Sequence, residues 1–337
     1  MEIITGIHQI KLPIPDNPLG YINTYLIAGN DGWLMVDTGW DSPQAFAELE
    51  NHLRDIGIAI NDISMIVLTH THPDHCGLTS KLKQLCTAYL YLHQMENITL
   101  EPWQDNGGEY SRDTTKQLKL GGMSEDEVFK IQGSFQTGNN AQATLLPDML
   151  LHGGEIISTG VCNFEVMWTP GHSPGHICLY EKEKKVLLSG DHILPTITPN
   201  VSQYSTKIRK NPLREYLSSL KMMEPLEVDI VLPAHEHVFS DLQKRIKELL
   251  LHHEHRLDAI LDVTRGEPKT TYQIASRIPW LVEMIDEKEV KGTSFADLSV
   301  LQKGLAMGET SAHVELLKRE NKVERFFKDN TVYYKCI

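Results

Sequence analysis

The stretch THTHPDHCG, residues 69–77, follows the apolar run ISMIVL and places three histidines and one aspartate within six positions. The apolar run predicts a buried strand, so the polar residues occupy the loop at its end. Neutral imidazole and carboxylate groups are the ligands that zinc and similar divalent metals prefer. Histidines two positions apart do not share one helix face, and such a cluster cannot be buried without partners. The stretch therefore indicates a metal site.

Three further places repeat this arrangement, in which a strand-like apolar run ends in a loop that carries His or Asp. They are TPGHSPGH at 169–176, SGDH at 189–192 and PAHEH at 233–237. A lone histidine after a strand is more often a surface or core residue, but loops at strand ends can bring distant side chains together. One metal needs three or four protein ligands, so the pooled set is large enough for two. The candidates are His70, His72, Asp74, His75, His172, Asp191 and His235.

The composition is that of an ordinary soluble globular protein, with 337 residues and a formal net charge of −13. A strongly acidic chain is repelled by phosphate backbones and by anionic membranes, which disfavours a nucleic-acid or membrane partner. No run reaches the roughly 18 apolar residues of a membrane helix, and the first residues do not read as a signal peptide. The five cysteines are scattered and form no CxxC pair, which is typical of a reducing compartment. We therefore expect a cytoplasmic protein that acts on a small molecule.

The order of the apolar runs predicts a layered α/β catalytic domain over residues 1–262. Residues 94–150 interrupt this domain with helical periodicity and no strong strand. The insertion is either extra surface structure or a lid that contacts the substrate, since long insertions in compact domains are often functional. Residues 263–337 predict three helices followed by a hairpin, which together make a small winged-helix-like domain.

The motifs now resemble those of a known family. HTHPDH is preceded by VDTG at 36–39 and followed by TPGH, GD and AH, in that order. This series resembles the metallo-β-lactamase-fold hydrolase superfamily over about residues 20–240. The segment ETSAHVELLKRENKVERF at 309–326 resembles the winged-helix extension of the branch that contains β-lactamase-like protein 2. The resemblance implies an αββα sandwich with the active site at one edge of its two sheets.

The resemblance also implies a role for each candidate ligand. It implies two divalent metal ions, with zinc as the favoured metal and iron or manganese as alternatives. One ion would be held by His70, His72 and His172, and the other by Asp74, His75 and His235. Asp191 would bridge both ions. Asp37, in the first motif, and His176, in the second half of TPGHSPGH, would orient the ligands or lie near the site without binding metal.

Several other residues could take part, and each has a plainer alternative. Asn200 and Tyr204 lie in the loop that follows the SGDH motif. Either side chain could donate a hydrogen bond to a developing oxyanion, or could simply pack within the loop. His252, His253 and His255 lie on a predicted long helix. They could form a further metal site, but a solvated helix face is the favoured interpretation.

Two functions remain open from the sequence. The first is hydrolysis of a small ester, thioester or lactone by a metal-bridging hydroxide, which Asp74 could orient as well as ligate. The second is phosphodiester cleavage, as an endoribonuclease on single-stranded RNA, which the resemblance to β-lactamase-like protein 2 implies. The acidic charge favours the first, and the basic residues within 310–337 alternate with acidic ones instead of forming a phosphate-binding stripe. The C-terminal segment could also make the contacts of a homodimer.

Overall fold

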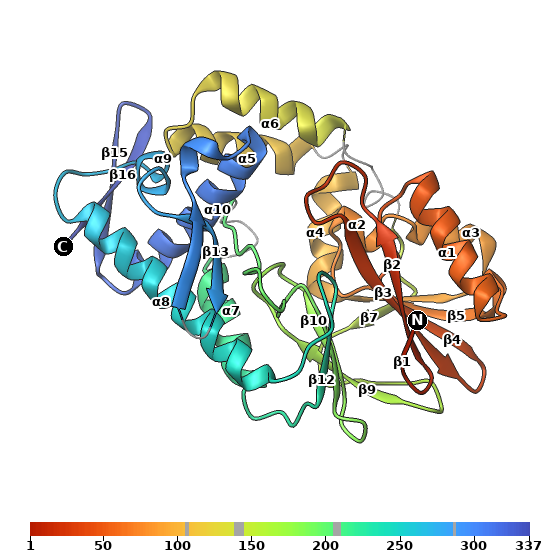
Figure 1. Cartoon of the computed structure of the whole chain (residues 1–337). Coiled ribbons are helices and arrows are strands. Elements are labelled where there is room, and N and C mark those ends of the chain that lie inside the picture. The colour runs from red at the N-terminus through yellow and green to blue at the C-terminus, as the bar shows by residue number, and fades with distance from the viewer. Residues whose placement is uncertain (105–107, 138–144, 205–209, 286–287) are drawn as a thin grey trace.

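The computed structural model describes residues 1–104, 108–137, 145–204, 210–285 and 288–337 (Figure 1). Two β-sheets face each other across a shared apolar core, and helices cover their outer faces. This arrangement confirms the predicted αββα sandwich. A second group of helices and two hairpins lies beside the sandwich.

The first sheet has seven strands, which follow one another in chain order. They are β1 (Glu2–Ile4), β2 (Ile7–Pro13), β3 (Tyr21–Gly29), β4 (Gly32–Val36), β5 (Ile63–Val67), β6 (Tyr89–His93) and β7 (Met149–Leu151). The strands from β4 to β7 pair in parallel. Because parallel neighbours end at the same edge of a sheet, the loops after β4 and β5 emerge side by side.

The second sheet has five strands in the order β12-β11-β10-β9-β8. They are β8 (Ile156–Ser158), β9 (Asn163–Trp168), β10 (Ile177–Glu181), β11 (Val186–Gly190) and β12 (Ile230–Pro233). Leu179 and Leu188 pack toward the first sheet, whereas their neighbours Cys178 and Leu187 pack toward the helices, as the two-residue period of a strand requires. β11 and β12 are parallel, so the loops that follow them also leave the sheet at one edge.

Four helices cover the outer faces of the sandwich. They are α1 (Pro43–Asp55) and α3 (Thr79–Leu85) on the first sheet, and α7 (Pro212–Met223) and α8 (Leu242–Thr264) on the second. The start of α1 follows from its sequence, since the Ser42 side chain accepts a hydrogen bond from the backbone N–H of Ala45 and Pro43 occupies the first helical turn. A short 3-10 helix, Ile60–Asp62, leads into β5.

The insertion and the C-terminal segment share one apolar core. The insertion contributes α5 (Gly108–Leu120) and α6 (Glu125–Thr137), whereas its first helix, α4 (Gln94–Gln104), places Leu100 in the core of the first sheet. The C-terminal segment contributes α9 (Thr271–Ala275), β13 (Trp280–Ile285), β14 (Lys288–Thr293), a 3-10 helix (Phe295–Asp297), α10 (Val300–Arg319), β15 (Val323–Lys328) and β16 (Thr331–Cys336). Leu118 of α5 and Ile131 of α6 are buried together with Leu317 of α10. We call α5, α6 and the described residues after α8 the cap.

The prediction of three helices in the C-terminal segment is wrong in one respect. The sequence after Ser299 forms one continuous helix, α10, although the prediction divided this stretch between two helices. A Cβ atom on Gly304 would lie 2.8 Å from Ile131 of α6, and one on Gly308 would collide with the Tyr204 ring. The glycines therefore allow close packing and do not end the helix. The hairpin β15–β16 was predicted, whereas β13–β14 was not, and the winged-helix character stays a prediction.

The predicted solvated face of the long helix is also wrong in part. α8 is one helix, but His252 and His253 on it are buried, and only His255 of the three is exposed. α10 covers this face, and the His253 Nδ1 lies 3.0 Å from the His313 Nε2. The predicted domain boundary after residue 262 falls within the last turn of α8, and the division into two domains stays a prediction. Among the described residues, no helix has both the length and the apolarity needed to cross a membrane.

Candidate metal centre

The four predicted loops meet at one edge of the sandwich, as the strand directions require. The loop 68–77 follows β5, and Asp191 and His235 follow the parallel strands β11 and β12. His172 lies in the β9–β10 turn, and this turn leads into the start of β10, which adjoins the end of β11 because the two strands are antiparallel. The two sheets are joined directly here, since the backbone N–H of Ile177 donates to the Thr69 carbonyl over 2.9 Å.

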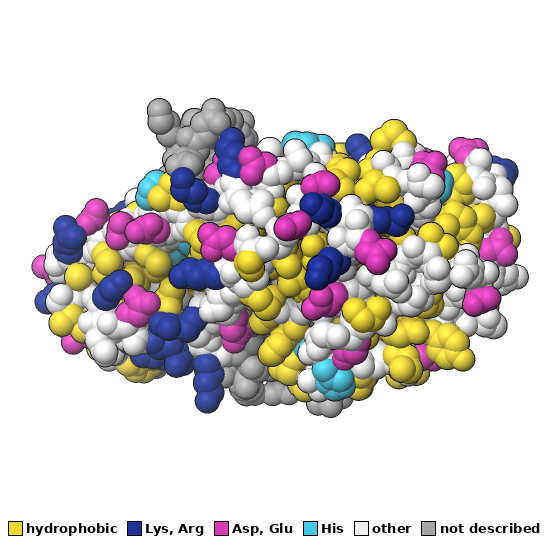
Figure 2. All heavy atoms as spheres, turned by 90° about the horizontal axis from the view of Figure 1, so that it is seen from below, with side chains coloured by type: hydrophobic (Ala, Val, Ile, Leu, Met, Phe, Trp, Pro, Cys, Tyr) yellow, Lys and Arg dark blue, Asp and Glu magenta, His cyan; other side chains and the backbone are white. Residues whose placement is uncertain are grey.

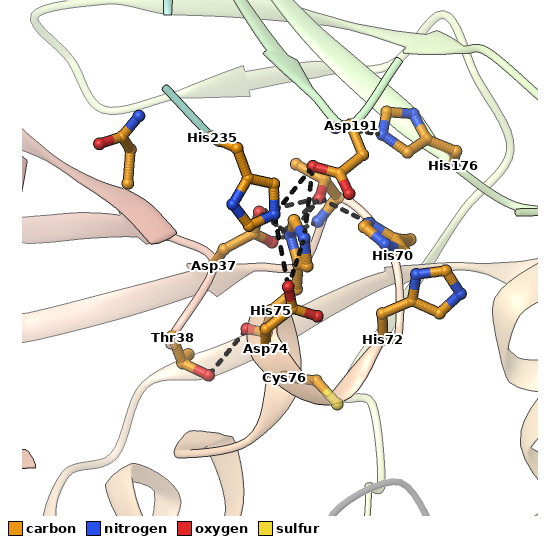
Figure 3. A network of polar contacts seen from close by, with 12 residues as sticks. Asp37, Thr38, His70, His72, Asp74, His75, Cys76, His176, Asp191 and His235 are labelled. Atoms are coloured by element: carbon orange, nitrogen blue, oxygen red, sulfur yellow. Dashed lines mark hydrogen bonds and ion pairs between the residues drawn. The ribbon is translucent and has the colours of Figure 1, made fainter. Parts of the chain in front are cut away.

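All seven predicted ligands fall into three groups with metal-binding geometry. Within each group, the candidate ligand atoms lie within 4.8 Å of one another. The groups are His70, His72 and His172; His70, His75 and Asp191; and Asp74, His75 and His235. Figure 3 shows Asp74, His75, Asp191 and His235 pointing toward one another. The groups overlap, so the seven residues form one connected centre.

Asp191 lies in the middle of this centre. Its Oδ1 is 3.5 Å from the His75 Nε2 and 3.4 Å from the His235 Nε2. Its Oδ2 is 3.4 Å from the His172 Nε2. Asp74 adds a second carboxylate on one side, with its Oδ2 3.3 Å from the His235 Nε2. The two oxygens of Asp191 therefore face two different sets of histidines.

Several ligand atoms are buried without a hydrogen-bond partner among the described residues. They are the Nε2 atoms of His70, His75 and His235 and the Oδ1 of Asp191. Leaving one buried polar atom unsatisfied costs about 1–3 kcal/mol, so four in one place need an explanation. These atoms belong to groups whose ligand atoms lie close together, so cations bound there would take their lone pairs and satisfy them.

The other ring nitrogen of each of these histidines is fixed by an oxygen acceptor. The Nδ1 of His75 lies 2.8 Å from the Asp37 carboxylate, and the Nδ1 of His235 lies 3.2 Å from the Tyr21 carbonyl. The Nδ1 of His172 lies 2.8 Å from the Asn200 carbonyl. Since these oxygens can only accept, we assign the proton to each Nδ1. The Nε2 lone pairs of His75 and His235 then face the centre, as ligands require, whereas the His172 Nε2 lies 2.9 Å from the His72 Nδ1.

Asp37 holds the histidine loop from beneath. Asp37 has a left-handed backbone with φ 58°. Its carboxylate accepts hydrogen bonds from the Thr69 backbone N–H and from the Thr69 hydroxyl, over 2.8 Å each. Because the Thr69 hydroxyl gives its proton to Asp37, its oxygen accepts from the His70 Nδ1 at 3.1 Å. Asp37 thus orients His75 directly and His70 through Thr69.

His176 lies beside Asp191 and supports it from behind (Figure 3). The Nε2 of His176 accepts from the Asp191 backbone N–H over 3.1 Å, and its Nδ1 contacts the Thr169 hydroxyl at 2.9 Å. A Cβ atom on Gly190 would lie 2.7 Å from that Nε2, and Gly190 also has φ 51°. The glycine in the SGDH motif is therefore required for this contact.

The electrostatics of the centre suit a cation. Burial lowers the pKa of His70 well below its usual value and that of His172 to about 4, so both rings are neutral ligands. Burial acts the same way on His75, but Asp191, Asp37 and Asp74 outweigh it and raise the pKa of His75. For Asp74, burial is outweighed by His75 and His235, which lower its pKa to about 2. The carboxylates around His75 thus favour positive charge at this centre.

The two residues predicted to contact substrate have other partners in the structure. Asn200 supplies its carbonyl to His172, and its side-chain amide lies 3.4 Å from Glu309 of α10. The Tyr204 hydroxyl donates to the Gly304 carbonyl over 3.2 Å. Substrate contact by either residue stays a prediction.

Thr69 and the Tyr21 carbonyl were not predicted, although both orient candidate ligands. Thr69 stands inside the motif but carries no metal-binding group, and a backbone carbonyl has no signal in the sequence. His237, two positions after His235, is exposed and lies outside the three groups.

Residues 17–235 match the family model described as Metallo-beta-lactamase superfamily, and the chain belongs to this superfamily. A probable metallo-hydrolase of Bacillus subtilis, YqjP, is 24% identical over 97% of both chains. The acyl-coenzyme A thioesterase MBLAC2 of Gallus gallus is 27% identical over 65% of this chain and 73% of its own. Membership in this superfamily and the three metal-binding groups support a metal-dependent hydrolase.

Solved structures resemble the whole chain, including the cap. The metallo-beta-lactamase family protein TTHA1429 of Thermus thermophilus superimposes with a TM-score of 0.82 at 28% identity and covers 100% of both chains. A beta-lactamase domain protein of Burkholderia ambifaria gives a TM-score of 0.83 at 25% identity, over 100% of this chain and 94% of its own. The more specific resemblance to β-lactamase-like protein 2 stays a prediction.

Proposed function

We propose that this chain is a dinuclear metal-dependent hydrolase that acts on a small ester, thioester or lactone. The observation that supports it best is the position of Asp191, whose two oxygens face different histidines. A carboxylate in this position could hold one oxygen toward each of two ions. The first ion would be held by His70, His72 and His172, and the second by Asp74, His75 and His235, with Asp191 between them.

The exposure of the candidate ligands indicates the side from which a substrate would approach. His70 and His75 are fully buried, whereas His72, Asp74 and His172 are partly exposed. Bound ions would activate a water molecule and polarise the attacked carbonyl group. Asp74, ionised at neutral pH and partly exposed, would accept a hydrogen bond from that water and orient it. His75 and His70 would act only as fixed ligands beneath it.

Among the acyl substrates, we favour a thioester. Two relatives are named as thioesterases: MBLAC2 of Gallus gallus and the atrochrysone carboxyl ACP thioesterase of Aspergillus fumigatus, which is 23% identical over 78% of this chain and 49% of its own. Both names refer to an acyl group on a carrier, coenzyme A or ACP. A carrier-bound acyl group would enter the candidate metal centre from the protein surface. The partly exposed side at His72 and His172 provides that approach in this chain.

Cleavage of RNA is the alternative that the sequence left open, and the structure offers it less support. On the face shown in Figure 2, Lys and Arg side chains lie among Asp and Glu side chains and do not gather into one basic stripe. Arg245, close to the loop after Asp191, is buried and donates to the carbonyls of Leu194 and Thr196. It is therefore used to hold that loop and does not offer its charge to a phosphate.

A metal and substrate screen tests the proposed function. Purified protein should bind about two divalent ions per chain and should hydrolyse acyl thioesters or lactones faster than bis-p-nitrophenyl phosphate or single-stranded RNA. His70→Ala should abolish the activity, whereas the matched control His237→Ala, at an exposed histidine, should keep it. A folded protein that binds no metal would refute the proposal. Ligand-dependent cleavage of RNA alone would move the conclusion to the alternative.

A further inference from the structure

One buried carboxylate outside the predicted centre joins two of its loops. Glu96 lies in the first turn of α4, directly after β6. Its side chain is almost completely buried, at 1% exposure. No motif pointed to this residue, and it belongs to none of the three metal-binding groups.

The two oxygens of Glu96 are divided between the two loops. Oε2 accepts from the Thr71 backbone N–H over 3.0 Å and from the Thr71 hydroxyl over 2.6 Å. Oε1 accepts from the Gly175 backbone N–H over 2.8 Å. Thr71 stands between His70 and His72, and Gly175 lies in the TPGHSPGH loop that carries His172.

The packing around Gly175 shows how close the contact is. A Cβ atom at this position would lie 2.5 Å from the Glu96 backbone nitrogen and 2.9 Å from the His93 Nδ1. Only a glycine lets the loop come close enough to α4 for the carboxylate to reach its N–H. The second glycine of TPGHSPGH is thus explained by Glu96.

A buried carboxylate is costly unless hydrogen bonds to it compensate for lost water. Three donors meet that requirement, and hydrogen bonds to a charged group are roughly twice as strong as those between neutral groups. The three hydrogen bonds to Glu96 therefore connect the HTHPDH loop of the first sheet with the TPGHSPGH loop of the second sheet. Between these loops, the His72 Nδ1 lies 2.9 Å from the His172 Nε2.

We propose that Glu96 is a positioning residue that holds the HTHPDH and TPGHSPGH loops at the separation one metal ion requires. It acts through Thr71 and Gly175, and its effect falls on His72 and His172. The first helix of the insertion is then part of the support of the metal centre. This inference rests on the proposed metal binding by those two histidines.

The test compares the zinc affinity of Glu96→Gln with that of the wild type by competition with a chelator. The amide has the same shape but only one acceptor oxygen, so one loop loses its hydrogen bond and faces a donor instead. We expect zinc affinity to fall at least about tenfold, as for other groups that support metal ligands. Glu181→Gln is the matched control, because Glu181 is also buried and accepts from a backbone N–H, that of Lys184, at the opposite end of β10.

A second variant keeps the test decisive if Glu96→Gln does not fold. Thr71→Val removes only the hydroxyl donor and should give a smaller loss of zinc affinity, since two of the three hydrogen bonds remain. Melting temperatures of the metal-free proteins should fall similarly for Glu96→Gln and Glu181→Gln. Wild-type zinc affinity in the folded Glu96→Gln variant, or in Thr71→Val if only that folds, would overturn the inference. A wild-type protein that takes up no zinc would overturn the proposed function as well.

Discussion

At the metal centre, His75 is fixed by a 2.8 Å contact between its Nδ1 and Asp37, whereas in the cap Leu317 is held by the apolar side chains around it. The first contact depends on two particular chemical groups at one distance and angle. The second depends on volume and shape, which several apolar residues could supply. The centre and the cap should therefore respond differently to substitution, and metal affinity is the quantity that separates them.

Asp191→Ala should have the largest effect on the centre. It removes the carboxylate whose two oxygens face His75, His235 and His172. Supporting groups around a metal typically contribute 10–100-fold, so loss of a shared ligand should reduce activity by more than about 100-fold. Thioester hydrolysis and the number of bound metal ions per chain measure this. Activity and metal content close to those of the wild type would show that Asp191 is not shared between two ions.

Asp37→Asn should have the next largest effect. Asn tolerates the left-handed backbone at this position, so the fold should be kept, but the charged acceptor for the His75 Nδ1 is lost. We expect metal affinity to fall roughly 10–100-fold in a chelator competition. Asp148→Asn serves as control, because Asp148 also accepts a backbone N–H, that of Leu90, in a place remote from the motif loops. An equal loss in both variants would point to general destabilisation.

Leu317→Ala should have the opposite effect, with a loss of stability and an unchanged metal affinity. Leu317 is fully buried in the cap core, and a change of this kind typically lowers the free energy of unfolding by about 2–5 kcal/mol. Denaturant unfolding should show that loss, while the metal affinity of the folded protein stays within about twofold of the wild type, since sites without shared partners act independently. A parallel fall in metal affinity would show that the cap and the centre are not separable.

Tyr204→Phe should have the smallest effect and tests a residue at the border between the two regions. Loss of the hydrogen bond to the Gly304 carbonyl should cost about 0.5–1.5 kcal/mol of stability. If the hydroxyl serves packing alone, kcat/KM for a thioester should stay unchanged. A fall in kcat/KM of more than about tenfold, with stability only slightly altered, would instead support the predicted contact with a developing oxyanion.

The apolar runs predicted a layered α/β domain, and the family resemblance implied the sandwich. The set of candidate ligands could be predicted because metal ligation restricts residue type and spacing. Only His, Asp and a few other residues can bind zinc, so they stand out in the loops after apolar strands. Their supporting groups do not stand out. Glu96 is one glutamate among many, and the carbonyls of Tyr21 and Asn200 belong to the backbone, which every residue has.

The cap was harder to predict because its determinants lie far apart in the chain. The prediction of three helices placed a break within α10, but Gly304 and Gly308 there pack closely against Ile131 and Tyr204 and the helix continues. His252 was predicted to lie on a solvated helix face, but it is buried on the face of α8 that α10 covers. At the two glycines, tertiary contacts outweigh a helix propensity that disfavours glycine by about 1 kcal/mol.

The shared core of the cap affects how the chain folds during its synthesis on the ribosome. Leu118, Val128 and Ile131 leave the ribosome well before Leu317 and Val332, which complete their burial. Until α10 and β16 are made, α5 and α6 present an apolar face without its native cover, and such surfaces are prone to aggregation. The cap core is thus completed only by α10 and β16, which follow the sandwich in the chain.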